Sequence, residues 1–234
     1  MEIIPAIIPQ SFEDLEDKVD QVNGLADFVQ VDICDGKFTP DKSWPIVGDD
    51  DGKFPLLVEE KEGLPHWDDV DYEIHLMTKT PSDEVGDWAK AGATRILVPI
   101  EAGSDAIKDI IDEWGSVVEI GLVANMETSV EVFESYLDKV ETIQLMSIDV
   151  IGHQGEPFDE KVIDKIKRLR EIGYKHKISI DGGINLENAK SLIEAGADRL
   201  IVGSAIWGSD NPVETLKKFK NLGAKHPTGG KLGV

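Results

Sequence analysis

The sequence is poor in cysteine and in long hydrophobic runs. Its single cysteine, Cys34, cannot form an internal disulfide and leaves no cysteine-based zinc site, which is typical of a reducing compartment. No apolar run approaches the roughly 20 residues that are needed to cross a bilayer. The start, Met1-Glu2-Ile3-Ile4-Pro5, has neither the basic segment nor the cleavage site of a signal peptide. We therefore expect a cytoplasmic protein without a membrane partner.

Positive charge is also scarce. Lysine and arginine together number 24 against 46 acidic residues, the formal net charge is -22, and only four residues are arginines. Such a chain repels the phosphate backbone of nucleic acid and offers few forked guanidinium contacts, so nucleic acid is not an expected partner. A small anion can still bind where backbone N–H groups and helix amino termini supply local positive potential.

Short apolar runs alternate with amphipathic stretches along the whole chain. This alternation is typical of βα units around a parallel sheet, and 234 residues suit a barrel, a fold that commonly has about 250 residues. The sequence therefore predicts the α/β class and a single (β/α)8 TIM barrel. The expected strands are Ile3–Ile8, Phe28–Ile33, Tyr72–Leu76, Arg95–Pro99, Val117–Val123, Thr142–Met146, Lys177–Ile180 and Arg199–Val202. One helix is expected from Phe12 onward. The other expected helices cover Glu84–Ala91, Ala106–Trp114, Val130–Leu137, Asp159–Ile172, Leu186–Ala195 and Val213–Leu222.

The expected barrel domain covers residues 1–223, and residues 224–234 are expected to form a flexible tail. One excursion, at about 40–71, is longer than a usual connection and contains three consecutive aspartates with several prolines and glycines. A lid over the site and a solvated surface loop both agree with this composition. The unit after the second strand fits the barrel pattern least well.

Polar residues that end apolar runs are the candidates for chemistry, because catalytic groups of a parallel barrel come from the carboxyl ends of its strands. Asp32, His75 and Asp181 stand at such positions. Each alone is more commonly structural, as a helix cap or a core histidine. Together they bring two carboxylates and an imidazole to one rim. Such carboxylates can remove a proton and return one from the other face, and the histidine can polarise a carbonyl or bind a metal.

Glycine-rich loops follow the last strands. Gly182 and Gly183 come after the seventh strand, Gly203 and Ser204 after the eighth, and the loop 152–155 after the sixth. One glycine pair alone can serve a tight turn. Two adjacent glycine loops at one rim instead favour a phosphate, because the loops after strands seven and eight are the usual phosphate site of this fold. A small phosphorylated molecule is therefore the expected ligand.

These residues resemble the ribulose-phosphate 3-epimerase family over nearly the whole chain. The family interconverts ribulose 5-phosphate and xylulose 5-phosphate by inverting C3 through an enediolate, in a barrel of the ribulose-phosphate-binding type. The matching stretches are Val31-Asp32-Ile33-Cys34-Asp35-Gly36-Lys37-Phe38-Thr39-Pro40, His75-Leu76-Met77, Leu145-Met146-Ser147, Asp181-Gly182-Gly183-Ile184-Asn185 and Val202-Gly203-Ser204-Ala205-Ile206.

The resemblance also implies roles for individual residues. It implies that Asp32 and Asp181 are the catalytic acid and base, and that the same pair with His75 ligates a divalent metal. It further implies that the phosphate is bound by Gly155, Gly183, Gly203 and Ser204. The apolar lining of the site is implied to include Met77 and Met146.

Departures from the family pattern fall within the expected site. Gln30 stands where the family has a metal-binding histidine, and an amide ligates transition metals far more weakly than imidazole, so the implied zinc, iron, manganese or cobalt ion loses a ligand. Ala6 lacks a serine hydroxyl, and Cys34 replaces a methionine. In the loop after the sixth strand, Gln154 replaces a glycine and Glu156 a glutamine.

Three functions agree with this mixture of retained and altered residues. The first is epimerisation of a ketopentose 5-phosphate, which uses the retained carboxylate pair. The second is another sugar-phosphate reaction on the same fold, of aldolase, synthase or decarboxylase type, which would explain the altered positions. The third is a phosphometabolite-binding protein without turnover. A binder has little use for two strand-end aspartates beside an anionic ligand, so catalysis is favoured. Barrels of this size often form homo-oligomers, but the sequence carries no interface signature.

Overall fold

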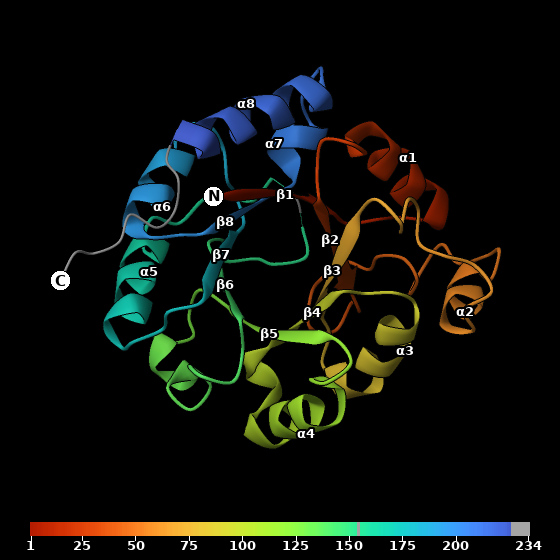
Figure 1. The fold of residues 1–234 in the computed structure, drawn as a ribbon, viewed down its shortest axis with the longest axis horizontal. Coiled ribbons are helices and arrows are strands. Elements are labelled where there is room, and N and C mark those ends of the chain that lie inside the picture. The colour runs from red at the N-terminus through yellow and green to blue at the C-terminus, as the bar shows by residue number, and fades with distance from the viewer. Residues whose placement is uncertain (154, 226–234) are drawn as a thin grey trace.

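The computed structural model, which describes residues 1–153 and 155–225, shows eight parallel strands that close into a barrel surrounded by helices (Figure 1). Each strand pairs with its neighbours in chain order, and β8 pairs with β1. The (β/α)8 TIM barrel predicted from the sequence is confirmed. The strands are β1 (Glu2–Ile7), β2 (Phe28–Cys34), β3 (Asp71–Met77), β4 (Arg95–Pro99), β5 (Glu119–Ala124), β6 (Thr142–Met146), β7 (Lys177–Asp181) and β8 (Arg199–Val202).

Helices surround the barrel, and their apolar faces form the main core against its outer surface (Figure 1). Helix α1 is representative: Ser11 caps its first turn by accepting a hydrogen bond from the backbone N–H of Asp14, and Leu15, Val19 and Val22 bury one face. The helices are α1 (Phe12–Val22), α2 (Lys53–Val58), α3 (Val85–Lys90), α4 (Ser104–Trp114), α5 (Val162–Glu171), α6 (Ala189–Ala195), α7 (Ser204–Trp207) and α8 (Pro212–Lys225), with 3-10 turns η1 (Pro81–Asp83), η2 (Ile100–Ala102) and η3 (Val130–Phe133).

The helix expected over Val130–Leu137 is not an α-helix. Only the short 3-10 turn η3 forms there. The buried side chains of this stretch, Val130, Phe133 and Tyr136, are three residues apart. This spacing suits the three-residue period of a 3-10 turn better than the 3.6-residue period of an α-helix.

The segment 40–71 packs against the barrel through aromatic side chains. Trp44 is fully buried, and its ring lies 5.6 Å from Phe12, 5.7 Å from Phe54 and 5.9 Å from Trp88 between ring centroids. Trp44 also donates its backbone N–H to the carbonyl of Pro9 at 2.8 Å. The segment contains α2 and is a packed cover for the second βα unit, which is neither a free lid nor a fully solvated loop.

Charged side chains close the amino-terminal end of the barrel. Arg95 on β4 donates to Glu73 on β3 at 2.6 Å and to Glu119 on β5 at 2.7 Å. Thr142 on β6 donates to the same Glu119 oxygen at 2.7 Å and accepts from Arg199 on β8 at 2.8 Å. Together with Glu2, Phe28 and Lys177, these residues form a set that we call the amino-end belt.

The amino-end belt reaches the remaining strands through three further contacts. Arg199 and Lys177 of β7 both donate to Glu2 of β1, at 2.7 and 3.2 Å. The guanidinium of Arg95 lies 4.8 Å from the ring centroid of Phe28 on β2. The belt therefore touches every strand, and it leaves the opposite, carboxyl-terminal end free for a functional site.

Two further expectations concern the chain ends and the membrane. The expected tail 224–234 begins inside α8, and residues 226–234 lie outside the described residues, so the domain boundary stays a prediction. Within the described residues, no helix has both the length and the apolar character that crossing a membrane requires.

Candidate active site

Asp32, His75 and Asp181 meet inside the carboxyl-terminal end of the barrel. The register of β2 and β3 places Asp32 beside His75, and β7 ends at Asp181. His75 Nδ1 lies 3.0 Å from Asp32 Oδ1 and 3.7 Å from Asp181 Oδ2. All three residues are buried. The structure therefore brings together the three residues that the sequence singled out at separate strand ends.

The side-chain amide of Gln30 bridges the carboxylates of Asp32 and Asp181. Gln30 lies two residues before Asp32 on β2, so the two side chains project to the same side of the strand. Its Nε2 donates to Asp32 Oδ1 at 2.8 Å and to Asp181 Oδ2 at 2.9 Å. Its Oε1 is buried and has no hydrogen-bond partner among the described residues. The amide thus holds the two acidic groups together while one of its own polar atoms stays unpaired.

Gln144 on β6 is a site residue that the sequence reasoning missed. Its Nε2 donates to Asp181 Oδ2 at 3.1 Å, so this oxygen accepts from both amides. The signal for Gln144 was its place two residues before Met146, which is an expected pocket residue on the same strand. A side chain at that spacing points to the same interior face.

Burial and mutual repulsion set the protonation of the carboxyl pair. Burial raises the pKa of Asp181 to about 7, and the nearby charge of Asp32 adds to this rise. Burial alone would lower the pKa of His75, but its hydrogen bond and charge interaction with Asp32, aided by the charge of Asp181, raise it. Asp181 is therefore the group that can hold a proton near neutral pH.

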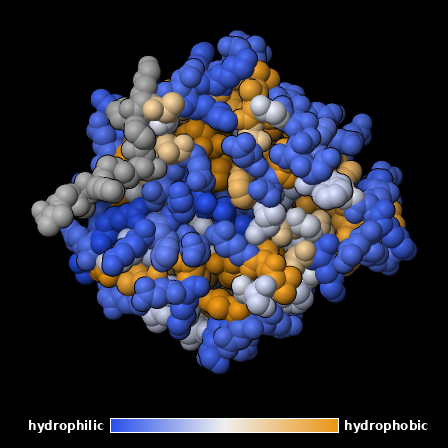
Figure 2. Space-filling model, in the orientation of Figure 1, coloured by the Kyte–Doolittle hydropathy of each residue, from blue (hydrophilic) through white to orange (hydrophobic). Residues whose placement is uncertain are grey.

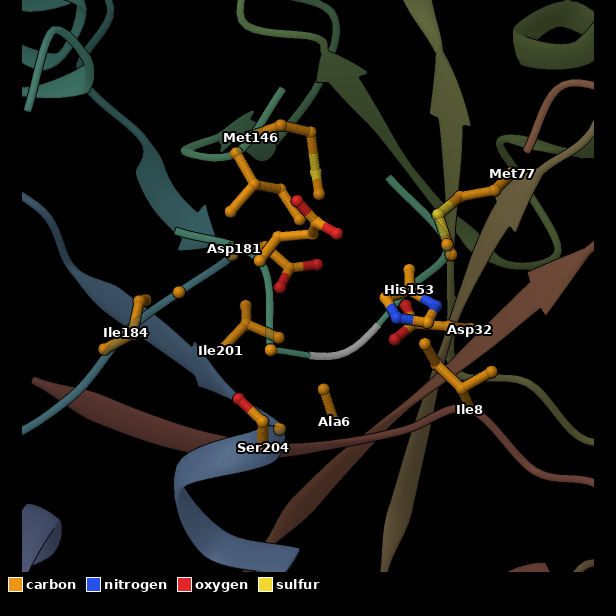
Figure 3. Close-up of a pocket in the computed structure, with 17 residues that line it drawn as sticks. Ala6, Ile8, Asp32, Met77, Met146, His153, Asp181, Ile184, Ile201 and Ser204 are labelled. Atoms are coloured by element: carbon orange, nitrogen blue, oxygen red, sulfur yellow. The ribbon is translucent and has the colours of Figure 1, made fainter. Parts of the chain in front are cut away.

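A pocket opens above these groups at the carboxyl-terminal rim (Figure 3). Asp32 and Asp181 line its floor together with the expected apolar residues Met77 and Met146. All five expected phosphate-binding residues also line it, namely Gly155, Gly182, Gly183, Gly203 and Ser204. Their roles stay predictions, but their positions around one opening agree with a single ligand that spans from the glycine loops to the carboxylates.

Gly183 shows why a glycine is needed in the loop after β7. Its φ is 62°, and an added Cβ would lie 2.8 Å from the backbone nitrogen of Phe158 and 3.0 Å from the carbonyl oxygen of Glu156. Ser147 fixes the neighbouring turn, since its hydroxyl donates to the Gly182 carbonyl at 2.6 Å. The loop after β7 therefore approaches the loop after β6 closely, backbone against backbone.

The donor atoms of Asp32, His75 and Asp181 suit a metal ion. They lie within 4.8 Å of one another and offer two carboxylate oxygens and one imidazole nitrogen, a set that divalent transition metals accept. Gln30 turns its amide nitrogen towards the same place, and an amide nitrogen does not ligate metals. Its unpaired Oε1 would face the ion if the amide turned over. Three residues thus fit a metal, and Gln30 fits it in one of two orientations.

Comparison with known proteins identifies relatives over most of the chain. The model of the ribulose-phosphate 3 epimerase family matches residues 2–207. The ribulose-phosphate 3-epimerase of Bacillus subtilis (strain 168) is 32% identical over 228 residues, which cover 94% of this chain and 98% of the relative. The chloroplastic ribulose-5-phosphate-3-epimerase of Arabidopsis thaliana is 32% identical over 225 residues, covering 93% of this chain and 75% of the relative.

Solved structures show the same fold at low sequence identity. A 3-hexulose-6-phosphate synthase superposes with a TM-score of 0.70 at 16% identity, covering 94% of this chain and 99% of that one. An orotidine 5'-phosphate decarboxylase from Pyrococcus horikoshii OT3 superposes with a TM-score of 0.64 at 19% identity, covering 94% and 97%. At these identities the likeness extends to the barrel fold alone.

Proposed function

This chain belongs to the ribulose-phosphate 3 epimerase family, and we propose that it inverts C3 of a ketopentose 5-phosphate, interconverting ribulose 5-phosphate and xylulose 5-phosphate. The observation that carries the proposal is the pair Asp32 and Asp181, held by one amide nitrogen at the floor of a glycine-rimmed pocket. The raised pKa of Asp181 supports it further, because the reaction needs one protonated and one ionised carboxyl at the same time.

In the proposed reaction, the substrate lies with its phosphate against the backbone N–H groups at Gly183, Gly203 and Ser204. Asp32 accepts the proton from C3, the electron pair moves towards the C2 carbonyl, and Asp181 delivers a proton to the other face of C3. In the reverse reaction the two residues exchange roles. Gln30 and Gln144 keep Asp181 in position throughout, because both amides donate to its Oδ2.

The proposed cofactor is a divalent metal held by Asp32, His75 and Asp181. When bound, such an ion supplies positive charge to the oxygens of the enediolate. Replacing Gln30 with histidine adds an imidazole ligand, so the Q30H variant should bind Zn²⁺ about tenfold or more tightly than wild type in calorimetric titration. Q30L is the control, since it removes the amide without adding a ligand. Equal affinities for Q30H and wild type would contradict the proposed site.

Deuterium exchange tests the reaction itself. The protein is mixed with ribulose 5-phosphate in deuterated water, with and without added Mn²⁺ or Zn²⁺, and NMR follows the incorporation of deuterium at C3. We expect exchange in wild type and a loss of at least about 1000-fold in D181N. The control is D164N, which changes an exposed aspartate on the outer helix α5. Absence of exchange under all conditions would contradict epimerisation, and a different product would favour another sugar-phosphate reaction.

A further inference from the structure

His153 stands at the mouth of the pocket, in the loop between β6 and α5. It lines the same pocket as Asp32 and Asp181. Figure 3 places it on the side of Ile8 and Met77, whereas Ser204 lies across the opening. Ser204 belongs to the proposed phosphate side, so His153 stands at the opposite end, where the far end of a sugar phosphate would lie.

Asp41 fixes the orientation of the imidazole. His153 Nδ1 lies 2.7 Å from Asp41 Oδ2, and an ionised carboxylate only accepts hydrogen bonds, so Nδ1 carries the proton. The backbone carbonyl of Asp41 accepts a hydrogen bond from the Thr39 hydroxyl at 3.0 Å, which ties Asp41 to its own loop. Nε2 of His153 has no hydrogen-bond partner among the residues that the structure describes, so this nitrogen remains available to a ligand.

The loop that carries His153 is also held by its neighbour Gly152. An added Cβ at Gly152 would lie 2.5 Å from Thr39 Cβ, so the backbone of Gly152 packs closely against the Thr39 side chain. The Cys34 thiol lies 3.9 Å from the Gly152 carbonyl oxygen. These contacts join the loop after β6 to the loop after β2 beside the pocket. The position of His153 therefore depends on packing as well as on Asp41.

His153 differs in charge from the other titratable residues that line the pocket. Among the described residues that line the pocket, Asp32, Glu156 and Asp181 are acidic, and His153 is the one that can carry a positive charge. The hydrogen bond to Asp41 raises the pKa of His153, and the charge of Asp41 adds to this rise. At its end of the pocket, His153 therefore offers a hydrogen-bonding side chain that adds no negative charge.

We propose that His153, oriented by Asp41, binds the substrate through Nε2 at a hydroxyl group of the sugar end away from the phosphate, accepting from that hydroxyl when the imidazole is neutral and donating to it when the imidazole is protonated. This assignment rests on the proposed function, because it takes the ligand to be a sugar phosphate whose phosphate lies at Gly183, Gly203 and Ser204. His153 would then help to decide which sugar is accepted, while the glycine loops would recognise only the phosphate.

Two ligands distinguish recognition of the sugar by His153 from a general effect of His153 on ligand binding. Calorimetry measures the dissociation constants of ribulose 5-phosphate and of inorganic phosphate, which has no sugar. In H153A, we expect ribulose 5-phosphate to bind about tenfold more weakly and inorganic phosphate to change by less than about twofold. H153Q should recover part of the loss, because its amide can donate from a similar position. D41N should weaken ribulose 5-phosphate binding to a smaller extent than H153A.

The matched control is H66A. His66 also pairs with an aspartate, Asp20, at 2.6 Å, but it does not line the pocket, so neither ligand should change. Equal weakening of both ligands in H153A, or no change in either, would overturn the inference, as would a wild type that does not bind ribulose 5-phosphate. Binding by wild type without deuterium exchange at C3 would instead overturn only the proposed reaction and leave the comparison of the two ligands valid.

Discussion

The Oδ2 atom of Asp181 accepts hydrogen bonds from two buried amides, at 2.9 Å from Gln30 and 3.1 Å from Gln144. The amide oxygens of both residues are buried without a partner among the described residues. A buried polar atom without a partner costs roughly 1–3 kcal/mol. Both glutamines are therefore retained at a cost in stability, which is expected of residues that position a functional group rather than fill a core.

The variant Q144L tests this interpretation. Leucine keeps most of the volume but donates nothing to Asp181, so kcat should fall about tenfold with little change in KM. The midpoint of thermal unfolding should not fall, because the substitution also removes an unpaired buried oxygen. Q21L, which changes an exposed residue of α1, serves as control. A lower unfolding midpoint with unchanged kcat would show that Gln144 has a structural role instead.

Sequence reasoning reached Asp32, His75 and Asp181 but not Gln144, and the difference has a physical cause. In β6, Ile143 and Leu145 alternate with polar Thr142 and Gln144, so the apolar pair resembles the buried face of a half-exposed strand. In a closed barrel both faces are buried, and the polar face is the interior one. The spacing of Gln144 from Met146 indicates the interior face, but the barrel register is needed to show that Gln144 points at Asp181.

At the scale of elements, the strands could be predicted more completely than their helical partners. Each strand is a short, self-contained apolar run, whereas the helical cover of the second unit depends on contacts that are distant in sequence. Trp44 illustrates this: it is fully buried among Phe12 of α1, Phe54 of α2 and Trp88 of α3. No local period in the segment 40–71 shows that these side chains meet.

The aromatic cluster should therefore be a large contributor to stability. Trp44→Ala should lower the free energy of unfolding by about 3–5 kcal/mol, since it removes a fully buried indole and leaves a cavity. Urea denaturation followed by circular dichroism measures this loss. Trp67→Ala is the matched control, because Trp67 is 69% exposed and should change stability by about 0.5 kcal/mol or less. Similar losses in both variants would contradict the packed description of this segment.

The amino-end belt predicts a dependence of stability on pH. Burial alone would raise the pKa of Glu119, but the hydrogen bond and charge of Arg95, with the hydrogen bond from Thr142, hold this pKa below its ordinary value of 4.5. A carboxyl with a lowered folded-state pKa stabilises the protein above its unfolded pKa, and this contribution disappears as pH falls through the folded pKa.

Glu119→Gln should therefore lower the free energy of unfolding by roughly 1 kcal/mol at pH 7 and by less at about pH 3, because the stabilisation by the ionised carboxylate declines as the pH falls below the unfolded-state pKa towards the folded-state pKa. Urea denaturation of wild type and variant at both pH values gives the two differences. E187Q, which changes an exposed residue outside the belt, should show no such change with pH. A constant difference for E119Q at both pH values would contradict the role of its charge.

For the whole molecule, the net charge of -22 opposes the approach of any anion. Hydrophilic side chains cover most of the outer edge of the face shown in Figure 2. The pocket itself is lined by three acidic side chains and one histidine among its described residues. The proposed sugar phosphate must therefore be attracted locally, by the backbone N–H groups of the glycine loops and by His153, against a repulsive surrounding field.

Salt should speed this encounter instead of slowing it. Raising KCl from about 10 to 150 mM shortens the Debye length from about 30 to 8 Å, so kcat/KM for ribulose 5-phosphate should rise about two- to threefold. The value of kcat should stay constant, because salt screens the approach of the free ligand and not the steps that follow binding. The constant kcat serves as the internal control. Steady-state kinetics over a series of KCl concentrations measures both quantities. A fall in kcat/KM would indicate net electrostatic attraction.

The amino-end belt has a consequence for how this protein can evolve. Its residues tie together all eight strands at one end of the barrel, while Asp32, Asp181 and His153 line the pocket at the other. A mutation that alters the chemistry or the preferred sugar therefore leaves the belt intact. Successive substitutions at the rim can therefore alter the pocket while the barrel stays folded. A mutant library restricted to rim residues should accordingly contain mostly folded proteins.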